Sequence, residues 1–301
     1  ELEEYMTESK FFLLFKGQLA NDREKFVQDW IVNWHYQDGQ EGTYPEGQPQ
    51  NFFEYSGPED LITWFRWVRS PMPNYLPEEM MAPLMAESIE RDREIFNLHN
   101  IPQNDGHFDS YAILNAQDYL FTHLYPTPDR QSIKNVLDFG AGYGRHSNLF
   151  SRYVESLTYL AVDAIPLSYC LQNFYLQQME LPFYEYVGSA DEFEISDDAP
   201  GLYHLPTWRT DLLPENYFDV ILCTQVLPEL SPQLVSFIIM QFVKTLKSGG
   251  MLYIRDHEDR FNPSNINIAF LLAKAGFTLE FRPWVTDGDD IHGIPRIWRL
   301  T

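Results

Sequence analysis

The residues of this chain best suited to bind a ligand lie in one short stretch, 135–146. Two apolar residues, Val136-Leu137, predict a buried strand, and residues 147–153 are suited to a helix. An acid, Asp138, follows the strand. Three glycines then stand at every second position: Gly140, Gly142 and Gly144. Glycines at a strand-to-helix turn let the backbone bend sharply and let a ligand lie against the main chain.

The spacing of this turn favours a cationic ligand over a phosphate. A dinucleotide site uses the longer spacing G-x-G-x-x-G to seat a pyrophosphate at the start of a helix. Here the spacing is G-x-G-x-G, with Asp138 two residues before the first glycine. A carboxylate there would repel a phosphate and attract a cation such as an amino-acid ammonium. An NAD-dependent oxidoreductase is therefore disfavoured.

The run 138–144 resembles the glycine-rich signature of class I methyltransferases that use S-adenosylmethionine. Asp163 stands 25 residues after Asp138, at the end of a second predicted strand over 157–162. An acid at that position can accept both hydroxyls of a ribose. The stretch 217–223, Tyr-Phe-Asp-Val-Ile-Leu-Cys, also resembles the family's Phe-Asp strand. The resemblance covers residues 132–301, and a narrower similarity to sugar O-methyltransferases rests on 163–176 alone.

The resemblance implies that S-adenosylmethionine is the cofactor and S-adenosylhomocysteine the product. It implies cofactor contacts along the turn and at the second strand's end: Asp138, Gly140, Ala141, Gly142, Tyr143, Gly144, Asp163 and Ala164. It also places two residues after the Phe-Asp strand near the ligand: Thr224 and Gln225. The adenine contact has two alternatives, either Ser189-Ala190-Asp191 or Asp211, and the sequence leaves both open.

The order of predicted elements indicates an α/β fold. From residue 132 short strands alternate with helices, which predicts a mostly parallel, doubly wound Rossmann-like methyltransferase sheet. The segments 277–282 and 294–300 fit a closing antiparallel pair. We expect the third strand over 183–187 and an insertion over 196–207. Residues 129–301 would form the S-adenosylmethionine-binding domain.

Residues 1–128 differ from the rest and predict a helical N-terminal cap that binds substrate. Helices are expected over 2–34, 60–69, 77–97 and 107–123, with a loop over 38–58. Four of the seven tryptophans lie in this part: Trp30, Trp34, Trp64 and Trp67. Aromatic faces can stack on a substrate ring, and a lid of this kind shields methyl transfer from water.

Methyl transfer is an in-line displacement that often needs a base to take a proton from the acceptor. The candidate base is His257, just past the fifth predicted strand, with Asp256 placed to orient its imidazole. His292, in the loop before the last strand, is a further candidate. Acidic groups over 256–259 and 287–290 have oxygen ligands suited to Mg²⁺. In a chain this acidic we expect them to be solvated, and we expect no metal.

Composition limits the partners. The net charge of −23 disfavours nucleic acid, because such a surface repels phosphates. No run of about 18 apolar residues predicts a membrane span, and no secretory pattern is present. Two cysteines in apolar contexts, Cys170 and Cys223, indicate a reducing, cytoplasmic compartment. A homodimer is compatible with the sequence.

The expected function is methyl transfer from S-adenosylmethionine to a small molecule, with a hydroxyl of a sugar or natural product as the favoured acceptor. The alternatives are methylation of nitrogen, carbon or a carboxylate, and a non-enzymatic module that binds S-adenosylmethionine.

Overall fold

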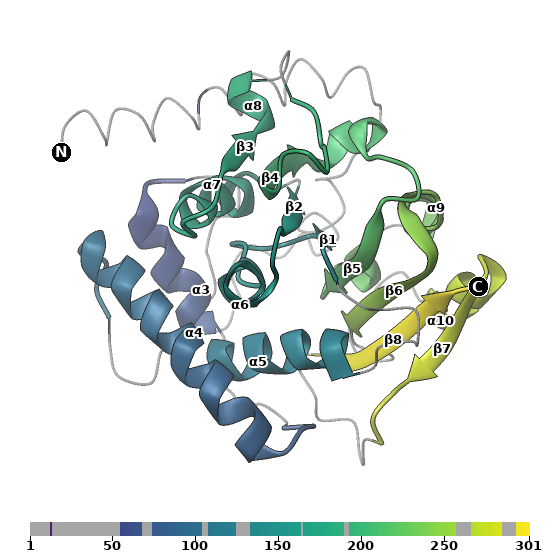
Figure 1. Ribbon diagram of the computed structural model, residues 1–301, viewed down its shortest axis with the longest axis horizontal. Helices are drawn as coiled ribbons and strands as arrows, with labels where there is room; N and C mark the ends of the chain where they lie inside the picture. The colour runs from purple at the N-terminus through teal and green to yellow at the C-terminus, as the bar shows by residue number, and fades with distance from the viewer. Residues whose placement is uncertain are drawn as a thin grey trace, which may run out of the picture.

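Eight strands of the described chain form one sheet at the centre of the protein (Figure 1). The computed structural model describes residues 13, 55–67, 74–103, 108–124, 133–163, 165–189, 193–230, 232–256, 266–284 and 293–301. The strands are β1 (Asn135–Phe139), β2 (Thr158–Asp163), β3 (Phe183–Glu185), β4 (Gly201–Pro206), β5 (Phe218–Thr224), β6 (Leu246–Asp256), β7 (Phe277–Phe281) and β8 (Ile294–Leu300).

The sheet has the order β3-β4-β2-β1-β5-β6-β8-β7. All pairings among strands β1 to β6 are parallel, whereas β8 runs antiparallel to both β6 and β7. The chain first builds outward from β1 through β2 and then returns to add β5 on the other side of β1. The predicted fold class, a doubly wound and mostly parallel sheet with an antiparallel last strand, is confirmed.

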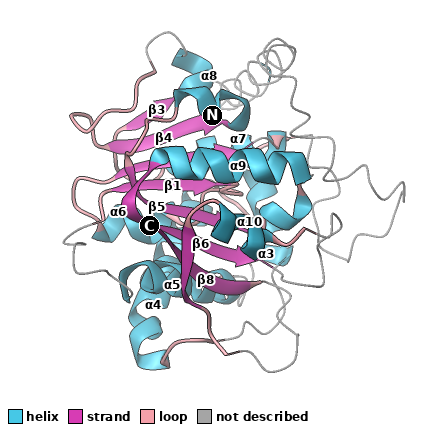
Figure 2. Cartoon of the chain, turned by 90° about the vertical axis from the view of Figure 1, so that its right-hand side faces the viewer, coloured by secondary structure: helices cyan, strands magenta, loops and turns pink. Residues whose placement is uncertain are grey.

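Helices cover both faces of the sheet. They include α6 (Ser147–Tyr153), α7 (Pro166–Leu176), α9 (Pro232–Thr245) and α10 (Ile268–Lys274). Figure 2 shows α9 and α10 lying over one face. Their apolar side chains pack on Leu137, Ile221 and Leu252 in one core cluster. Residues between these in the strands, such as Val136 and Val220, face a second cluster under α6 and α7.

The prediction was wrong in one region of the sheet. The third predicted strand, 183–187, is shorter, because β3 ends at Glu185 and the short helix α8 (Tyr186–Ser189) follows. The predicted insertion over 196–207 instead contains β4, whose six residues are all buried. Strand β4 pairs in parallel with β2, from Thr158↔Gly201 to Asp163↔Pro206. The strand next to β2 is therefore β4, and β3 lies at the edge.

Three helices of the N-terminal part are α3 (Leu61–Trp67), α4 (Glu78–Leu98) and α5 (Asp109–Leu124). They match the helices predicted over 60–69, 77–97 and 107–123. The predicted helix over 2–34 lies outside the described residues except for residue 13, and the predicted loop over 38–58 does so except for 55–58. Apolar side chains of α3 to α5 share the second core cluster with the sheet. The division between residues 128 and 129 stays a prediction.

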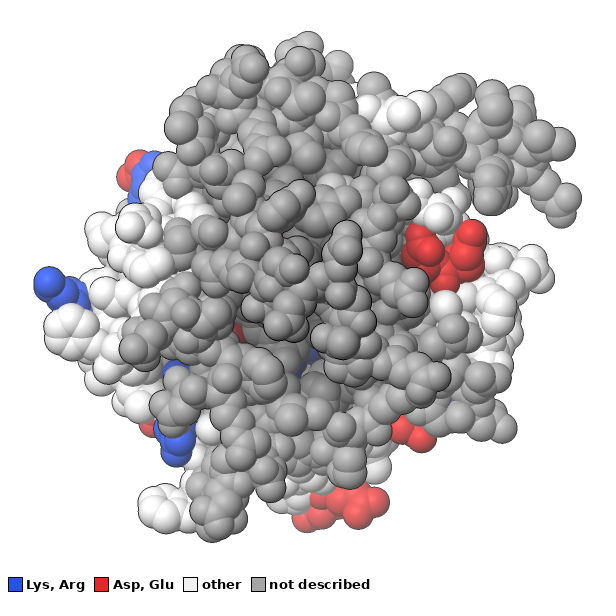
Figure 3. Space-filling view, turned by 180° about the vertical axis from the view of Figure 1, so that it is seen from behind, with Lys and Arg blue, Asp and Glu red and all other residues white. Residues whose placement is uncertain are grey.

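Charged side chains are spread over the described surface. Figure 3 shows acidic and basic groups at separate places on the face seen from behind. None of the described helices has both the length and the apolar character that a membrane span requires.

A buried carboxylate joins three of the helices. Asp92 on α4 accepts hydrogen bonds at Oδ1 from the Tyr175 hydroxyl of α7 (2.6 Å) and from Asn148 Nδ2 of α6 (3.1 Å). Its Oδ2 is buried and has no hydrogen-bond partner in the described part of the chain. Burial raises the pKa of Asp92 to about 7, against the lowering effect of those two hydrogen bonds.

We expect Asp92→Asn to stabilise the protein relative to wild type increasingly as the pH rises. The folded-state pKa of about 7 lies above the ordinary aspartate pKa of 3.8. The stability that Asp92 contributes is therefore complete below pH 3.8 and is lost as the pH rises through 7. Urea unfolding across this range should show the difference in unfolding free energy growing by a few kcal/mol in favour of the variant. A difference that is constant with pH would contradict the buried, raised pKa.

Candidate functional site

The candidate site lies where the strand order of the sheet reverses. Strand β1 has β2 on one side and β5 on the other, and the chain reaches β5 only after building β2, β3 and β4. In open α/β sheets ligands bind beyond the carboxyl ends of the strands at such a point. The carboxyl ends here carry Phe139, Asp163 and Thr224, and the glycine turn follows directly after β1.

The glycine turn has a backbone that other residues rarely adopt. The φ angles of Gly140, Gly142 and Gly144 are +72°, +61° and +89°. A Cβ at Gly140 would lie 2.3 Å from Val226 Cγ2, so the loop after β5 passes close over the turn. The Gly140 N–H also donates to the Val162 carbonyl of β2 (2.8 Å), which ties the turn to the neighbouring strand. These contacts explain why glycine is needed at Gly140 on grounds of both φ and space.

Asp163 at the end of β2 is held against the same turn. Its Oδ2 accepts from the Gly142 N–H (3.2 Å) and from Gln172 Nε2 on α7 (3.1 Å). Its Oδ1 accepts from the Ile165 N–H (2.9 Å). The structure thus brings the predicted ribose acceptor to the glycine turn with a fixed carboxylate orientation.

Asp138 at the end of β1 is fully buried. Its Oδ2 accepts from His146 Nδ1 (2.7 Å), at the start of α6, and from the Tyr159 hydroxyl of β2. Its Oδ1 is buried and has no hydrogen-bond partner among the described residues. A buried acceptor without a donor is costly, by about 1–3 kcal/mol. Oδ2 therefore accepts hydrogen bonds from the protein, and Oδ1 is suited to accept one from a ligand.

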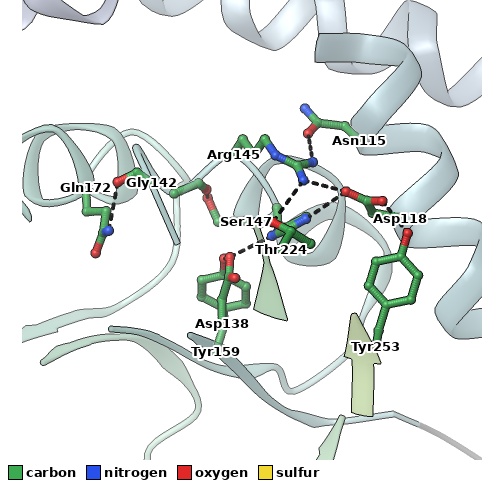
Figure 4. Close-up of polar contacts among 12 residues, drawn as sticks. Asn115, Asp118, Asp138, Gly142, Arg145, Ser147, Tyr159, Gln172, Thr224 and Tyr253 are labelled. Atoms are coloured by element: carbon green, nitrogen blue, oxygen red, sulfur yellow. Dashed lines mark hydrogen bonds and ion pairs between the residues drawn. The ribbon is translucent and has the colours of Figure 1, made fainter. Parts of the chain in front are cut away.

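A second buried carboxylate, Asp118 on α5, organises the residues that follow the turn (Figure 4). Its Oδ2 accepts from Arg145 Nη2 and lies 3.0 Å from His146 Nε2. Its Oδ1 accepts from the Tyr253 hydroxyl and from Arg255 Nε (3.1 Å), both on β6. Burial alone would raise the pKa of Asp118, but Arg255, Arg145 and His146 together hold it well below its usual value. Asp118 is therefore an anion inside the protein.

The two carboxylates share His146. Its Nδ1 faces Asp138 and its Nε2 faces Asp118, so the imidazole spans from β1 to α5. Arg145 extends the same network, because its Nη1 donates to Asn115 Oδ1 of α5 (2.9 Å) and its Nη2 lies 3.5 Å from Thr224 Oγ1 of β5. A helix of the N-terminal part is thus bonded directly to the two residues that follow the glycine turn, and through His146 to Asp138 before it.

Asp256, at the end of β6, supports the loop after β5. Its Oδ1 accepts from the Val226 N–H (3.1 Å), and the Gln225 N–H donates to the Arg255 carbonyl (3.0 Å). Gln225 itself has a φ of +57°. Burial raises the pKa of Asp256 to about 6, although Arg296 acts in the opposite direction. Because Asp256 is fully buried, its described contacts hold this loop in place.

The N-terminal helices contact the turn through aromatic side chains. Carbon atoms of the Trp64 ring on α3 lie 3.6 Å from the position that a Cβ on Gly142 would occupy. The Tyr143 ring is buried against Trp64, Phe65 and Tyr111, with centroid distances of 6.2, 5.4 and 5.5 Å. Tyr143 therefore packs in the core, and Trp64 is the cap side chain placed at the glycine turn.

The other predicted site residues fall into two groups. Several lie outside the described residues: Ala164, Ala190, Asp191, His257 and His292. The side chain of Ser189 is likewise outside the description, whereas Ala141 is buried within the turn. Asp211 is exposed and pairs with Arg209 Nε and Nη2 (3.0 and 3.1 Å). Its segment, η2 (Thr207–Leu212), follows β4 and so stands beside the end of β2.

Comparisons with known proteins add little to this description. No known family model matches the chain, and no curated protein matches it. Solved structures with a similar fold include the 1,6-didemethyltoxoflavin-N1-methyltransferase of Burkholderia thailandensis, with 17% identity, 78% of this chain and 93% of that chain covered, and a TM-score of 0.45. A TehB-like SAM-dependent methyltransferase from Corynebacterium glutamicum has 15% identity over 71% of this chain and 98% of its own, with a TM-score of 0.43. Such values are too low to assign an activity.

We expect Asp118→Asn to destabilise the fold severely and Tyr253→Phe to do so mildly. The first change leaves two buried arginines without their anion, which costs about 3–5 kcal/mol. The second removes one hydrogen bond, which costs about 1 kcal/mol. Chemical denaturation of both variants measures the two losses, and equal losses would show that Asp118 does not act as the central anion.

Proposed function

We propose that this protein transfers a methyl group from S-adenosylmethionine to a small molecule. The observation that carries the proposal is the glycine turn with three positive φ angles at the reversal point of the sheet, next to the carboxylate of Asp163. A loop without side chains lets a ligand lie against the main chain, and an acid after the second strand can accept ribose hydroxyls.

The described residues fit this cofactor. Asp138 Oδ1 is a buried acceptor without a donor among them, and an amino-acid ammonium is a donor of the right charge. Asp163 offers a fixed carboxylate to the ribose, and Trp64 offers an aromatic face beside Gly142. When bound, the sulfonium of S-adenosylmethionine supplies the methyl group. The chain's own part is to orient the cofactor and the acceptor and to exclude water.

The favoured acceptor is a hydroxyl of a sugar or natural product. The aromatic side chains of the N-terminal helices support a small organic acceptor, because the Trp64 ring lies beside the turn, 3.6 Å from the position of a Cβ on Gly142. For a hydroxyl a base is needed, and His257 stays our candidate, with Asp256 to orient its imidazole and His292 as the second candidate. The 17%-identical structure from Burkholderia thailandensis is named as an N-methyltransferase with bound 1,6-didemethyltoxoflavin and S-adenosylhomocysteine, so a nitrogen acceptor is the first alternative.

The cofactor step is tested by calorimetry with S-adenosylmethionine. We expect wild type to bind and Asp163→Ala to bind at least tenfold more weakly, since hydrogen bonds to a charged group contribute about 1.5–3 kcal/mol. Glu215→Ala is the matched control, because its carboxylate is largely exposed and contacts only the surface Lys244 among the described residues (3.3 Å). Absence of binding by wild type would refute the proposal.

The acceptor atom is tested by mass spectrometry of products. We expect wild type, given S-adenosylmethionine and a panel of hydroxylated and nitrogen-containing metabolites, to produce S-adenosylhomocysteine and one singly methylated product. Fragmentation of that product distinguishes oxygen from nitrogen or carbon. Cofactor binding without turnover on any acceptor would instead favour the non-enzymatic binding module.

A further inference from the structure

A continuous chain of buried hydrogen bonds leads from β4 to the glycine turn. Gln172 on α7 donates through Nε2 to the Gly142 carbonyl (2.7 Å) and to Asp163 Oδ2 (3.1 Å). Its Oε1 lies 3.1 Å from His204 Nε2, on the central part of β4. Both Gln172 and His204 are completely buried. Figure 4 shows the Gln172 side chain directed at Gly142.

The direction of every bond in this chain is fixed by chemistry. A carbonyl and a carboxylate can only accept, so the two groups near Asp163 require the amide nitrogen of Gln172 on their side. The amide oxygen then faces His204 and can only accept, so His204 must carry a hydrogen on Nε2. Burial lowers the pKa of His204 well below its usual value, which makes this the neutral Nε2–H imidazole.

The ring of His204 is itself held in place by stacking. Its ring stacks on Tyr169 of α7, with centroids 3.7 Å apart and planes 21° apart. Its Nδ1, which carries no hydrogen in this tautomer, has no hydrogen-bond partner among the described residues. It lies 3.7 Å from Glu185 Oε1, which itself accepts a hydrogen bond from the Tyr169 hydroxyl (2.8 Å). The donor that fixes Gln172 therefore has little freedom to rotate.

Gln172 connects this series of hydrogen bonds to the proposed cofactor site. One amide nitrogen holds both the carbonyl of Gly142, which has a positive φ, and the carboxylate of Asp163. These are the two segments that the proposed cofactor would contact. A carboxylate that is held from within keeps a fixed orientation, which reduces the ordering needed when a ligand binds.

We propose that Gln172, held by His204, is a positioning residue that sets the affinity for the ribose of the cofactor. The inference rests on the proposed function, because it assigns Asp163 to the ribose hydroxyls. Gln172 does not itself touch the ligand. It orients Asp163 and fixes the Gly142 carbonyl, so its loss should weaken the binding of a ligand that has ribose hydroxyls and spare one that lacks them.

The test is calorimetry on the full chain with S-adenosylhomocysteine and with its 2′,3′-dideoxy analogue. Wild type should bind S-adenosylhomocysteine at least tenfold more tightly than the analogue. Gln172→Leu should lower the affinity for S-adenosylhomocysteine about tenfold and change the affinity for the analogue by less than about twofold. Gln177→Leu is the matched control, because this glutamine is exposed at the end of the same helix and bonds only locally to Asn173 within the described chain.

A second variant, His204→Phe, guards against misfolding of the first. Phenylalanine keeps a ring to stack on Tyr169 but removes the donor to Gln172, so the same selective loss is expected at a smaller size. If either folded variant loses affinity equally for both ligands, or loses no affinity, the positioning role alone is overturned. Equal affinity of wild type for the two ligands would overturn it too, by removing Asp163 from the ribose. Wild type that binds neither ligand would overturn the proposed function as well.

Discussion

The buried carboxylate of Asp118 is the constraint on which the rest of the site depends. A charge inside a protein must be compensated by partners with good geometry. Here Asp118 accepts hydrogen bonds from Arg145, Tyr253 and Arg255, and it lies 3.0 Å from His146 Nε2. Asp118 itself is on α5, whereas these partners lie just before α6 and on β6. Since all of them meet at one side chain, α5 can lie on the sheet in only one way, and the chain just after the glycine turn is fixed with it.

This arrangement changes how the N-terminal helices are understood. The sequence favours a cap added to a separate cofactor domain, and that division stays a prediction. In the structure α5 supplies both apolar side chains to the sheet's core and the anion that holds Arg145 and His146. The glycine turn therefore depends on residues far earlier in the chain, which predicts that α5 and the sheet unfold together rather than as independent units.

The sequence predicted the parts of the fold that leave a local pattern. The glycine turn, the Phe-Asp strand and the closing antiparallel pair are short runs with characteristic residues, and each is where it was expected. Strand β4 was missed because His204 interrupts its apolar residues and Pro206 ends it, so the segment has the composition of a loop. The polar networks were missed for another reason. Asp118 and Arg255 are 137 residues apart, and no local spacing reports a contact of that kind.

Two networks thus hold the two acids that the sequence singled out, and they reach different parts of the fold. Asp138 is connected through His146 to Asp118 and so to α5, whereas Asp163 is connected through Gln172 to His204 and so to β4. No described hydrogen bond joins one acid to the other. A disturbance of α5 would therefore reach the ammonium side of the proposed site first, and a disturbance of β4 the ribose side. Asp138 accepts protein hydrogen bonds at one oxygen and Asp163 at both, so the direction of each carboxylate is set before any ligand arrives.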